Sequence, residues 1–170
     1  MLPPSPNHAY VLLGANLGER AATLAQARWR LAAQVGEVLA VSALYETAPW
    51  GGELVEDQPA YLNQVVVVDT FLDPFALLRQ LHAIESALGR TRGQQWQART
   101  LDLDLLVFGG IQLDFGPELI LPHPRLAERR FVLVPLAEVA PALLIPGTGG
   151  LTAADLLARC PDPLEVRKVE

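Results

Sequence analysis

The chain has 170 residues, of which 51% are hydrophobic and 19% charged, and this composition is typical of a globular domain rather than a disordered segment. The length predicts one domain with a substantial core, spanning residues 1–170. A net charge of -6 and a pI near 5.0 argue against a broad basic surface for non-specific nucleic-acid binding.

The remaining composition points to the cytoplasm. Cys160 is the only cysteine, so no internal disulfide is expected, which fits a reducing compartment. No hydrophobic run approaches the roughly 18 residues of a membrane span. The first residues lack the basic start and apolar core of a signal peptide, and residues 1–7 are expected to be a disordered tail. We therefore expect a cytoplasmic protein that binds neither nucleic acid nor membrane. We also expect a monomer, although no feature of the composition determines the oligomeric state.

Hydrophobic periodicity predicts the first elements of the chain. A short buried strand at Ala9–Leu13 ends in the glycine-containing turn 14–18. A helix is expected at about Arg20–Gln34, because apolar residues recur on one of its faces. Val38–Tyr45 is expected to form a second strand. Leu62–Asp69, which contains four consecutive valines, is expected to form a third.

The second helix has the clearest boundaries. Asp73 can cap its start, Pro74 suits its first turn, and Gly89 can end it. A strand containing Asp102 follows. The order strand, helix, strand, strand, helix, strand predicts an α+β fold, namely a ferredoxin-like βαββαβ sandwich. Its helices should cover one face of a mostly antiparallel sheet.

The C-terminal part is expected to add shorter elements to this fold. A strand is predicted near Ile111–Phe115, and short helical pieces within Arg125–Glu138. A final helix should begin at Thr152, because Thr152 and Asp155 have the spacing of a capping box.

The segment R-T-L-D-L-D-L at residues 99–105 carries the most information about chemistry. Its alternating pattern predicts a strand on which Asp102 and Asp104 project to the same side. Their Cα atoms should lie about 6.5 Å apart, so the two carboxylates repel each other unless a cation lies between them. Mg²⁺ is commonly held by one or two carboxylates together with phosphates. The alternative is an amphipathic strand with a solvated acidic face.

A basic segment precedes these carboxylates. Residues 89–99 include Arg90, Arg92 and Arg99 but no acidic residue, and their glycines and glutamines predict a loop. Guanidinium groups on one side and metal ions on the other could together bind the phosphates of a nucleotide triphosphate.

A second long loop, residues 47–61, connects the second and third strands. Loops of this length in small domains are often functional. Trp50, Tyr61 and Asn63 offer flat faces and an amide that could bind a planar heterocycle. Each aromatic residue alone could equally be a core residue.

Together these motifs resemble one family, the 6-hydroxymethyl-7,8-dihydropterin pyrophosphokinases of folate biosynthesis. The resemblance runs from Tyr10 to Leu144, and it is strongest where R-T-L-D-L-D occurs with D-Q-P-A-Y-L-N at residues 57–63. The resemblance also includes shorter motifs at residues 14–18, 45–49, 84–85, 89–92, 122–125 and 129–131.

The resemblance implies the reaction and the catalytic residues. Members transfer the terminal diphosphate of ATP to the hydroxymethyl oxygen of the pterin and release AMP, by in-line attack at the β-phosphorus assisted by two magnesium ions. It implies that Asp102 and Asp104 hold the metal ions, and that Arg90 and Arg99 stabilise the charge that develops during transfer.

The resemblance also implies binding residues for both substrates. The pterin would lie between Tyr61 and Phe131. Its other contacts are expected from Thr47, Ala48, Pro49, Trp50 and Asn63, and those of ATP from His82, Glu85, Arg92, Trp96, Arg99, Leu105, His123 and Arg129.

Several of these residues have structural alternatives. His123, between two prolines, could be a turn residue, Glu85 an ordinary helix acid, and Arg129 a solvated charge. Some members carry Lys and Arg where this chain has 93–95, and an arginine where it has Glu118, which bears on rate and nucleotide affinity rather than on the reaction.

Two other functional classes remain open. A nucleotide-sensing domain would bind ATP without releasing AMP. A nucleic-acid-binding ferredoxin-like module would display aromatic and basic residues on the sheet face.

Overall fold

The computed structural model describes residues 6–48, 59–89 and 101–169. Within these ranges a six-stranded sheet has the order β5-β1-β4-β3-β8, with β2 also paired to β4, and every pairing is antiparallel. A two-stranded sheet is formed by β6 and β7. The strands are β1 (Asn7–Ala15), β2 (Glu37–Val41), β3 (Tyr45–Thr47), β4 (Tyr61–Thr70), β5 (Asp102–Phe108), β6 (Leu113–Phe115), β7 (Leu119–Leu121) and β8 (Val166–Lys168).

Within these ranges one helix follows β1, a second follows β4, and two more follow β7. They are α1 (Arg20–Gln34), α2 (Pro74–Ala87), α3 (Arg130–Val139) and α4 (Ala153–Ala158), with a 3₁₀ turn at Leu126–Glu128. In the βαββαβ unit, β1 is the first strand, β2 and β3 together are the second, β4 is the third and β5 is the fourth. The order of the unit's strands in the sheet is therefore fourth, first, third, second. The predicted α+β, ferredoxin-like arrangement is therefore confirmed.

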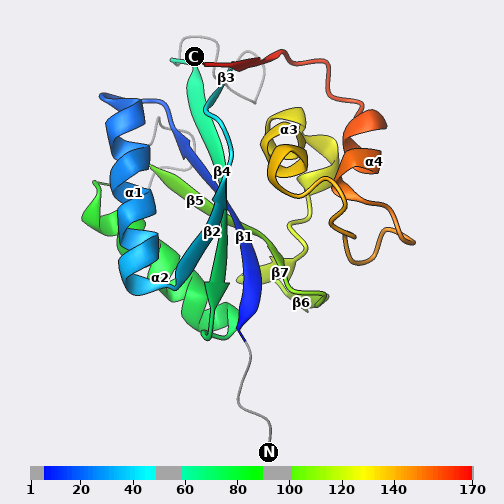
Figure 1. Cartoon of the computed structure of the whole chain (residues 1–170), viewed down its shortest axis with the longest axis horizontal. Helices are drawn as coiled ribbons and strands as arrows, with labels where there is room; N and C mark the ends of the chain where they lie inside the picture. The colour runs from blue at the N-terminus through cyan, green and yellow to red at the C-terminus, as the bar shows by residue number, and fades with distance from the viewer. Residues whose placement is uncertain (1–5, 49–58, 90–100, 170) are drawn as a thin grey trace, which may run out of the picture.

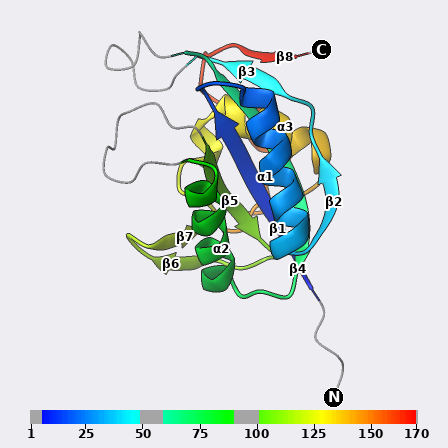
Figure 2. The same cartoon turned by 90° about the vertical axis from the view of Figure 1, so that its left-hand side faces the viewer.

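Helices cover both faces of the sheet (Figure 1). Helices α1 and α2 lie together on one face, as predicted (Figure 2). The C-terminal helices α3 and α4 cover the other face, so the expectation of helices on one face only was wrong. The reason is visible in the valine run of β4: Val66 and Val68 pack in the core cluster under α1 and α2, whereas Val65 packs in the cluster under α3 and α4. A strand that is apolar on both sides requires cover on both sides.

The predicted second strand, Val38–Tyr45, is divided into β2 and β3. Ser42 is buried, and its backbone N–H donates to Val65 O of β4 at 2.9 Å. In return the Val65 N–H donates to the Ser42 hydroxyl, at 3.0 Å, and not to a backbone oxygen. This side-chain bond replaces a ladder bond and interrupts the strand. As a result β2 pairs with the second half of β4 and β3 with its first half.

The predicted helix boundaries are confirmed for α1 and α2. The Asp73 carboxylate accepts the Ala76 N–H at 2.9 Å at the start of α2, and Gly89 after its end has a φ of 97°. Thr152 and Asp155 form the predicted capping box of α4. Asn7 was predicted to belong to the disordered tail, but it pairs with Thr70 in β1, so that boundary was wrong. In the described parts of the chain, no helix is both long and apolar enough to cross a membrane.

Candidate active site

Asp102 and Asp104 share one face of β5. Both are half-buried, whereas Leu103 and Leu105 between and beyond them are buried in the core cluster under α1 and α2. This alternation is the pattern that the sequence predicts for a strand with one leucine face and one acidic face. Because β5 is the last strand on its side of the sheet order, its outer edge is next to no other strand of the described sheet.

A cavity of about 280 Å³ lies along β5, between α2 and the hairpin formed by β6 and β7. Its walls come from α2, from β5, from residues 117–120 and from the turn after β7. It brings together six of the residues predicted to bind metal or ATP: His82, Glu85, Asp102, Asp104, Leu105 and His123. Glu85 is almost completely buried: it is only 1% exposed, which is unusual for a charged residue of a surface helix.

His123 is a neutral hydrogen-bond donor in this cavity. Burial, and next the charges of Arg129 and Arg125, lower its pKa to about 4. Its Nδ1 accepts the backbone N–H of Arg125 at 3.2 Å, so the proton of the neutral ring is assigned to Nε2. The backbone N–H of His123 donates to Leu106 O of β5 at 2.8 Å, which holds the turn against the acidic strand.

Arg129 is near enough to Asp104 for the two charges to interact. Burial lowers the pKa of Arg129, and the negative charge of Asp104 opposes this shift. Its guanidinium carbon lies 5.7 Å from the centroid of the Phe131 ring, a cation–π geometry. Arg129 therefore connects a residue predicted to bind metal with a residue predicted to stack on the pterin.

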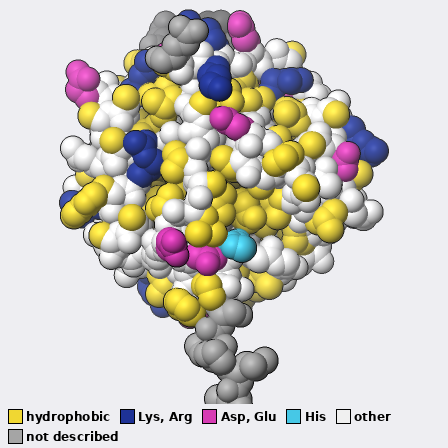
Figure 3. Space-filling model, in the orientation of Figure 1, with side chains coloured by type: hydrophobic (Ala, Val, Ile, Leu, Met, Phe, Trp, Pro, Cys, Tyr) yellow, Lys and Arg dark blue, Asp and Glu magenta, His cyan; other side chains and the backbone are white. Residues whose placement is uncertain are grey.

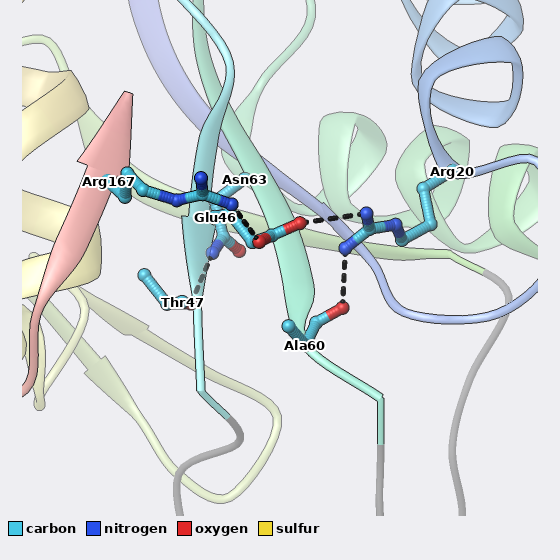
Figure 4. A network of polar contacts seen from close by, with 6 residues as sticks. All are labelled: Arg20, Glu46, Thr47, Ala60, Asn63 and Arg167. Atoms are coloured by element: carbon cyan, nitrogen blue, oxygen red, sulfur yellow. Dashed lines mark hydrogen bonds and ion pairs between the residues drawn. The ribbon is translucent and has the colours of Figure 1, made fainter. Parts of the chain in front are cut away.

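The residues predicted to read the pterin lie at the ends of β3 and β4. Asn63 and Thr47 are both buried, and Asn63 Nδ2 donates to Thr47 Oγ1 at 2.8 Å (Figure 4). Tyr61, two residues before Asn63 on the same face, is half-buried and pairs with Thr47. Phe131 is half-buried at the start of α3, the helix that covers this face.

Gly14 of β1 joins the two groups of residues. It pairs with Asn63 of β4 on one side and with Asp102 of β5 on the other. A Cβ atom at this position would lie 3.1 Å from Asn63 Oδ1 and 3.8 Å from a ring carbon of Tyr61. Glycine therefore keeps open the space between the amide and the acidic strand.

Ala48, a predicted pterin contact, directly follows Thr47 and is exposed. Outside the described residues lie Pro49, Trp50, Arg90, Arg92, Trp96 and Arg99.

The structure also shows polar residues near these strand ends that the sequence analysis did not name as site residues. Asn16, directly after β1, is 2% exposed, and neither of its amide atoms has a hydrogen-bond partner among the residues that the structure describes. Arg20 and Glu46 form an ion pair of 2.8 Å that lies on the other face of the sheet from Thr47 (Figure 4). The sequence shows Arg20 only as a residue at a helix start and Glu46 only as the middle residue of Y-E-T. Neither position indicates that the two side chains form an ion pair.

Comparison with known proteins assigns the family. Residues 10–141 match the family described as 7,8-dihydro-6-hydroxymethylpterin-pyrophosphokinase. A 2-amino-4-hydroxy-6-hydroxymethyldihydropteridine pyrophosphokinase of Methylorubrum extorquens is 47% identical over 163 residues, which cover 95% of this chain and 98% of that protein. The protein of the same name from Bacillus subtilis is 46% identical over 134 residues, 78% of each chain.

Among solved structures, that of Plasmodium falciparum HPPK-DHPS with pteroate aligns with a TM-score of 0.70 over 94% of this chain. The identity is 16% and the match covers 43% of that longer chain, so this likeness concerns the fold alone. The sequence match is decisive: the chain belongs to the 7,8-dihydro-6-hydroxymethylpterin-pyrophosphokinase family, and it is an enzyme that transfers pyrophosphate.

Proposed function

We propose that this enzyme transfers the diphosphate of ATP to the hydroxymethyl oxygen of 6-hydroxymethyl-7,8-dihydropterin and releases AMP, as a step of folate biosynthesis. The observation that carries the proposal is the cavity along β5, where Asp102, Asp104, Glu85 and His123 meet. Asp102 in the wall of this cavity pairs with Gly14 of β1, and Gly14 pairs in turn with Asn63 of β4, so one strand separates the cavity from the candidate pterin residues.

The residues present fit magnesium bound together with a nucleotide. Two half-buried carboxylates on one strand face supply the hard oxygen ligands that Mg²⁺ prefers. Within the described ranges no group of three or more acidic, histidine or cysteine residues could hold a metal ion, which fits a metal that takes its other ligands from substrate and water. Asp102 and Asp104 would hold two Mg²⁺ ions, which neutralise phosphate oxygens and favour in-line displacement at the β-phosphorus.

The side chains of the enzyme then bind and orient the two substrates. His123 can donate from Nε2 to a phosphate oxygen without adding a charge, and Arg129 contributes a cation close to Asp104. Because Thr47 holds the amide of Asn63 in one orientation, Asn63 presents a fixed polar edge to the heterocycle. Tyr61 and Phe131 would stack on the two faces of the ring.

The remaining candidates stay proposals from the sequence. Arg90 and Arg99 are proposed to stabilise charge on the transferred group. Pro49 and Trp50 are proposed to line the pterin site, and Arg92 and Trp96 to contact ATP.

The test is release of AMP from MgATP in the presence and absence of the pterin. We expect AMP only when both substrates are present, and a loss of at least 100-fold in Asp102→Asn, an order of magnitude typical for the removal of an electrostatic catalytic group. Asp69→Asn is the matched control, because Asp69 is a half-buried strand carboxylate beside His8 at the other end of β1. ATP binding without pterin-dependent AMP release would instead favour a nucleotide-sensing domain.

A further inference from the structure

Arg20, the first residue of α1, bonds two chain segments that are distant in sequence. Its Nη1 donates to the backbone oxygen of Ala60 and its Nη2 to Glu46 Oε2, both at 2.8 Å (Figure 4). Ala60 directly precedes Tyr61 of β4, and Glu46 directly precedes Thr47 of β3. One guanidinium group therefore holds the ends of the two strands that carry the candidate pterin residues.

Strand β3 is short, so contacts at its ends bear strongly on its register with β4. Within the described ranges it has three residues and three pairs with β4. On its other side it pairs with β8, which is equally short. The hydrogen bond from Asn63 to Thr47 forms only if the ends of β3 and β4 stay aligned, because the two side chains come from different strands.

Arg20 acts from the face of the sheet opposite the candidate site. In β3, Tyr45 and Thr47 are buried, and Tyr45 bonds Glu138 of α3, whereas Glu46 between them bonds Arg20 of α1. Residues alternate between faces along a strand, so Glu46 projects away from Asn63 and Thr47. A substrate on the face of Thr47 would not touch Arg20.

The pair is also better suited to geometry than to stability. The side chains of Arg20 and Glu46 are 30% and 24% exposed, and ion pairs with this access to water contribute little to folding. A planar guanidinium that donates from two nitrogens in fixed directions nevertheless sets the relative position of its two acceptors. A displacement of about 1 Å in a group that positions a substrate can lower the catalytic rate on the order of 100-fold.

We propose that Arg20 is a positioning residue for the pterin: its two hydrogen bonds, to Ala60 and Glu46, align Tyr61 and Thr47 for binding. The assignment rests on the proposed function, since it requires that the pterin binds at these strand ends. It gives α1, which supplies no residue to the candidate site, a role in substrate selection. Glu46 is the second member of this arrangement, because it fixes the Arg20 side chain on β3.

Arg167 provides a matched control within the same network. Its Nη2 donates to Glu46 Oε1 at 2.6 Å, but its side chain is 67% exposed and it contacts neither Ala60 nor β4 in the described contacts. Arg167→Ala removes one arginine from Glu46 and leaves both bonds of Arg20 intact. Arg20→Ala removes the same side chain type from the same glutamate and also releases Ala60.

The experiment measures two dissociation constants for each variant, one for 6-hydroxymethyl-7,8-dihydropterin and one for a magnesium complex of a non-hydrolysable ATP analogue. In Arg20→Ala we expect the constant for the pterin to rise about tenfold and that for the analogue to change by less than about twofold, a selective loss of roughly 1.4 kcal/mol. Arg20→Lys should lie between wild type and Arg20→Ala, because it keeps the charge and loses the planar fork. Arg167→Ala should bind both ligands as the wild type does.

Two results would overturn the assignment. One is unchanged pterin affinity in folded Arg20→Ala, and the other is an equal loss for pterin and analogue, which indicates general destabilisation. If Arg20→Ala does not fold, Glu46→Ala serves instead, because it removes the acceptor that fixes Arg20 on β3, and Arg167→Ala controls for the second arginine on Glu46. Unchanged pterin affinity in Glu46→Ala has the same consequence. A wild-type protein that binds the analogue but no pterin would overturn the proposed function, an outcome that the variants do not produce.

Discussion

The phenol of Tyr45 in β3 donates a hydrogen bond to Glu138 Oε2 of α3 at 2.7 Å. The same carboxylate accepts the backbone N–H of Ala43 at 3.1 and 3.2 Å, where the chain passes from β2 to β3. A helix from the C-terminal part thus pairs the polar groups of the strand break. The contact also fixes α3, with Phe131, over the face that carries Thr47 and Asn63.

Glu138→Ala should lower the free energy of unfolding by about 1–3 kcal/mol, because it leaves the part-buried Tyr45 hydroxyl without its acceptor. Urea denaturation followed by circular dichroism measures this change. Glu165→Ala, at an exposed glutamate, is the control and should be nearly neutral. The loss of unfolding free energy in the double variant Glu138→Ala with Tyr45→Phe should be smaller than the sum of the losses in the two single variants. Full additivity would argue against the contact.

Tyr45 also makes stability depend on alkaline pH. Burial, and then the hydrogen bond and charge of Glu138, raise the pKa of Tyr45 to about 12 from 10.0. Because the unfolded chain loses this proton first, the stabilisation is complete below about pH 10 and is lost as the pH rises toward 12. Ultraviolet titration of the phenols should show one transition near pH 12 that is missing in Tyr45→Phe. A titration curve unaltered by this substitution would contradict the prediction.

The His123 ring should stay neutral, with its proton on Nε2, from about pH 5 upward in the metal-free protein. Its pKa is lowered to about 4, so the unfolded chain, with a value near 6.5, binds the proton first as the pH falls. The contribution of His123 to stability is therefore complete above about pH 6.5 and is lost between about 6.5 and 4. Nitrogen-detected NMR, with the signal assigned from His123→Gln, measures both tautomer and titration. A midpoint near 6.5 in the folded protein would refute it.

Asp104→Asn should remove the stabilisation that magnesium and a nucleotide provide together. A ligand at 100 times its dissociation constant stabilises a folded protein by about 2.7 kcal/mol, so the wild type should show a clear rise in Tm with Mg²⁺ and a non-hydrolysable ATP analogue. The variant should remain folded without ligand and show little of this rise. Asp69→Asn, the control, should behave as the wild type does. An undiminished rise in Asp104→Asn would exclude Asp104 as a metal ligand.

Local patterns account for the parts of the fold that were predicted correctly. The apolar stripe of α1, the Asp73 cap of α2 and the alternation in β5 are each contained within one turn or a few residues. Such patterns specify which side of an element is buried, because the helix and strand periods are fixed by backbone geometry. They also suffice to place Asp102 and Asp104 on one face. The R-T-L-D-L-D and D-Q-P-A-Y-L-N segments were specific enough to indicate the family.

Long-range contacts decided the rest. The division of the predicted second strand depends on Ser42 meeting Val65 and on Ala43 meeting Glu138, 95 residues away. The placing of Gly14 between Asn63 and Asp102 depends on sheet order, and the bonds of Arg20 depend on partners 26 and 40 residues distant. Periodicity specifies that a side of a strand or helix needs a partner but carries no information on which one. The choice is made when all the apolar faces and polar groups of the chain are satisfied together, and only then do the candidate site residues meet.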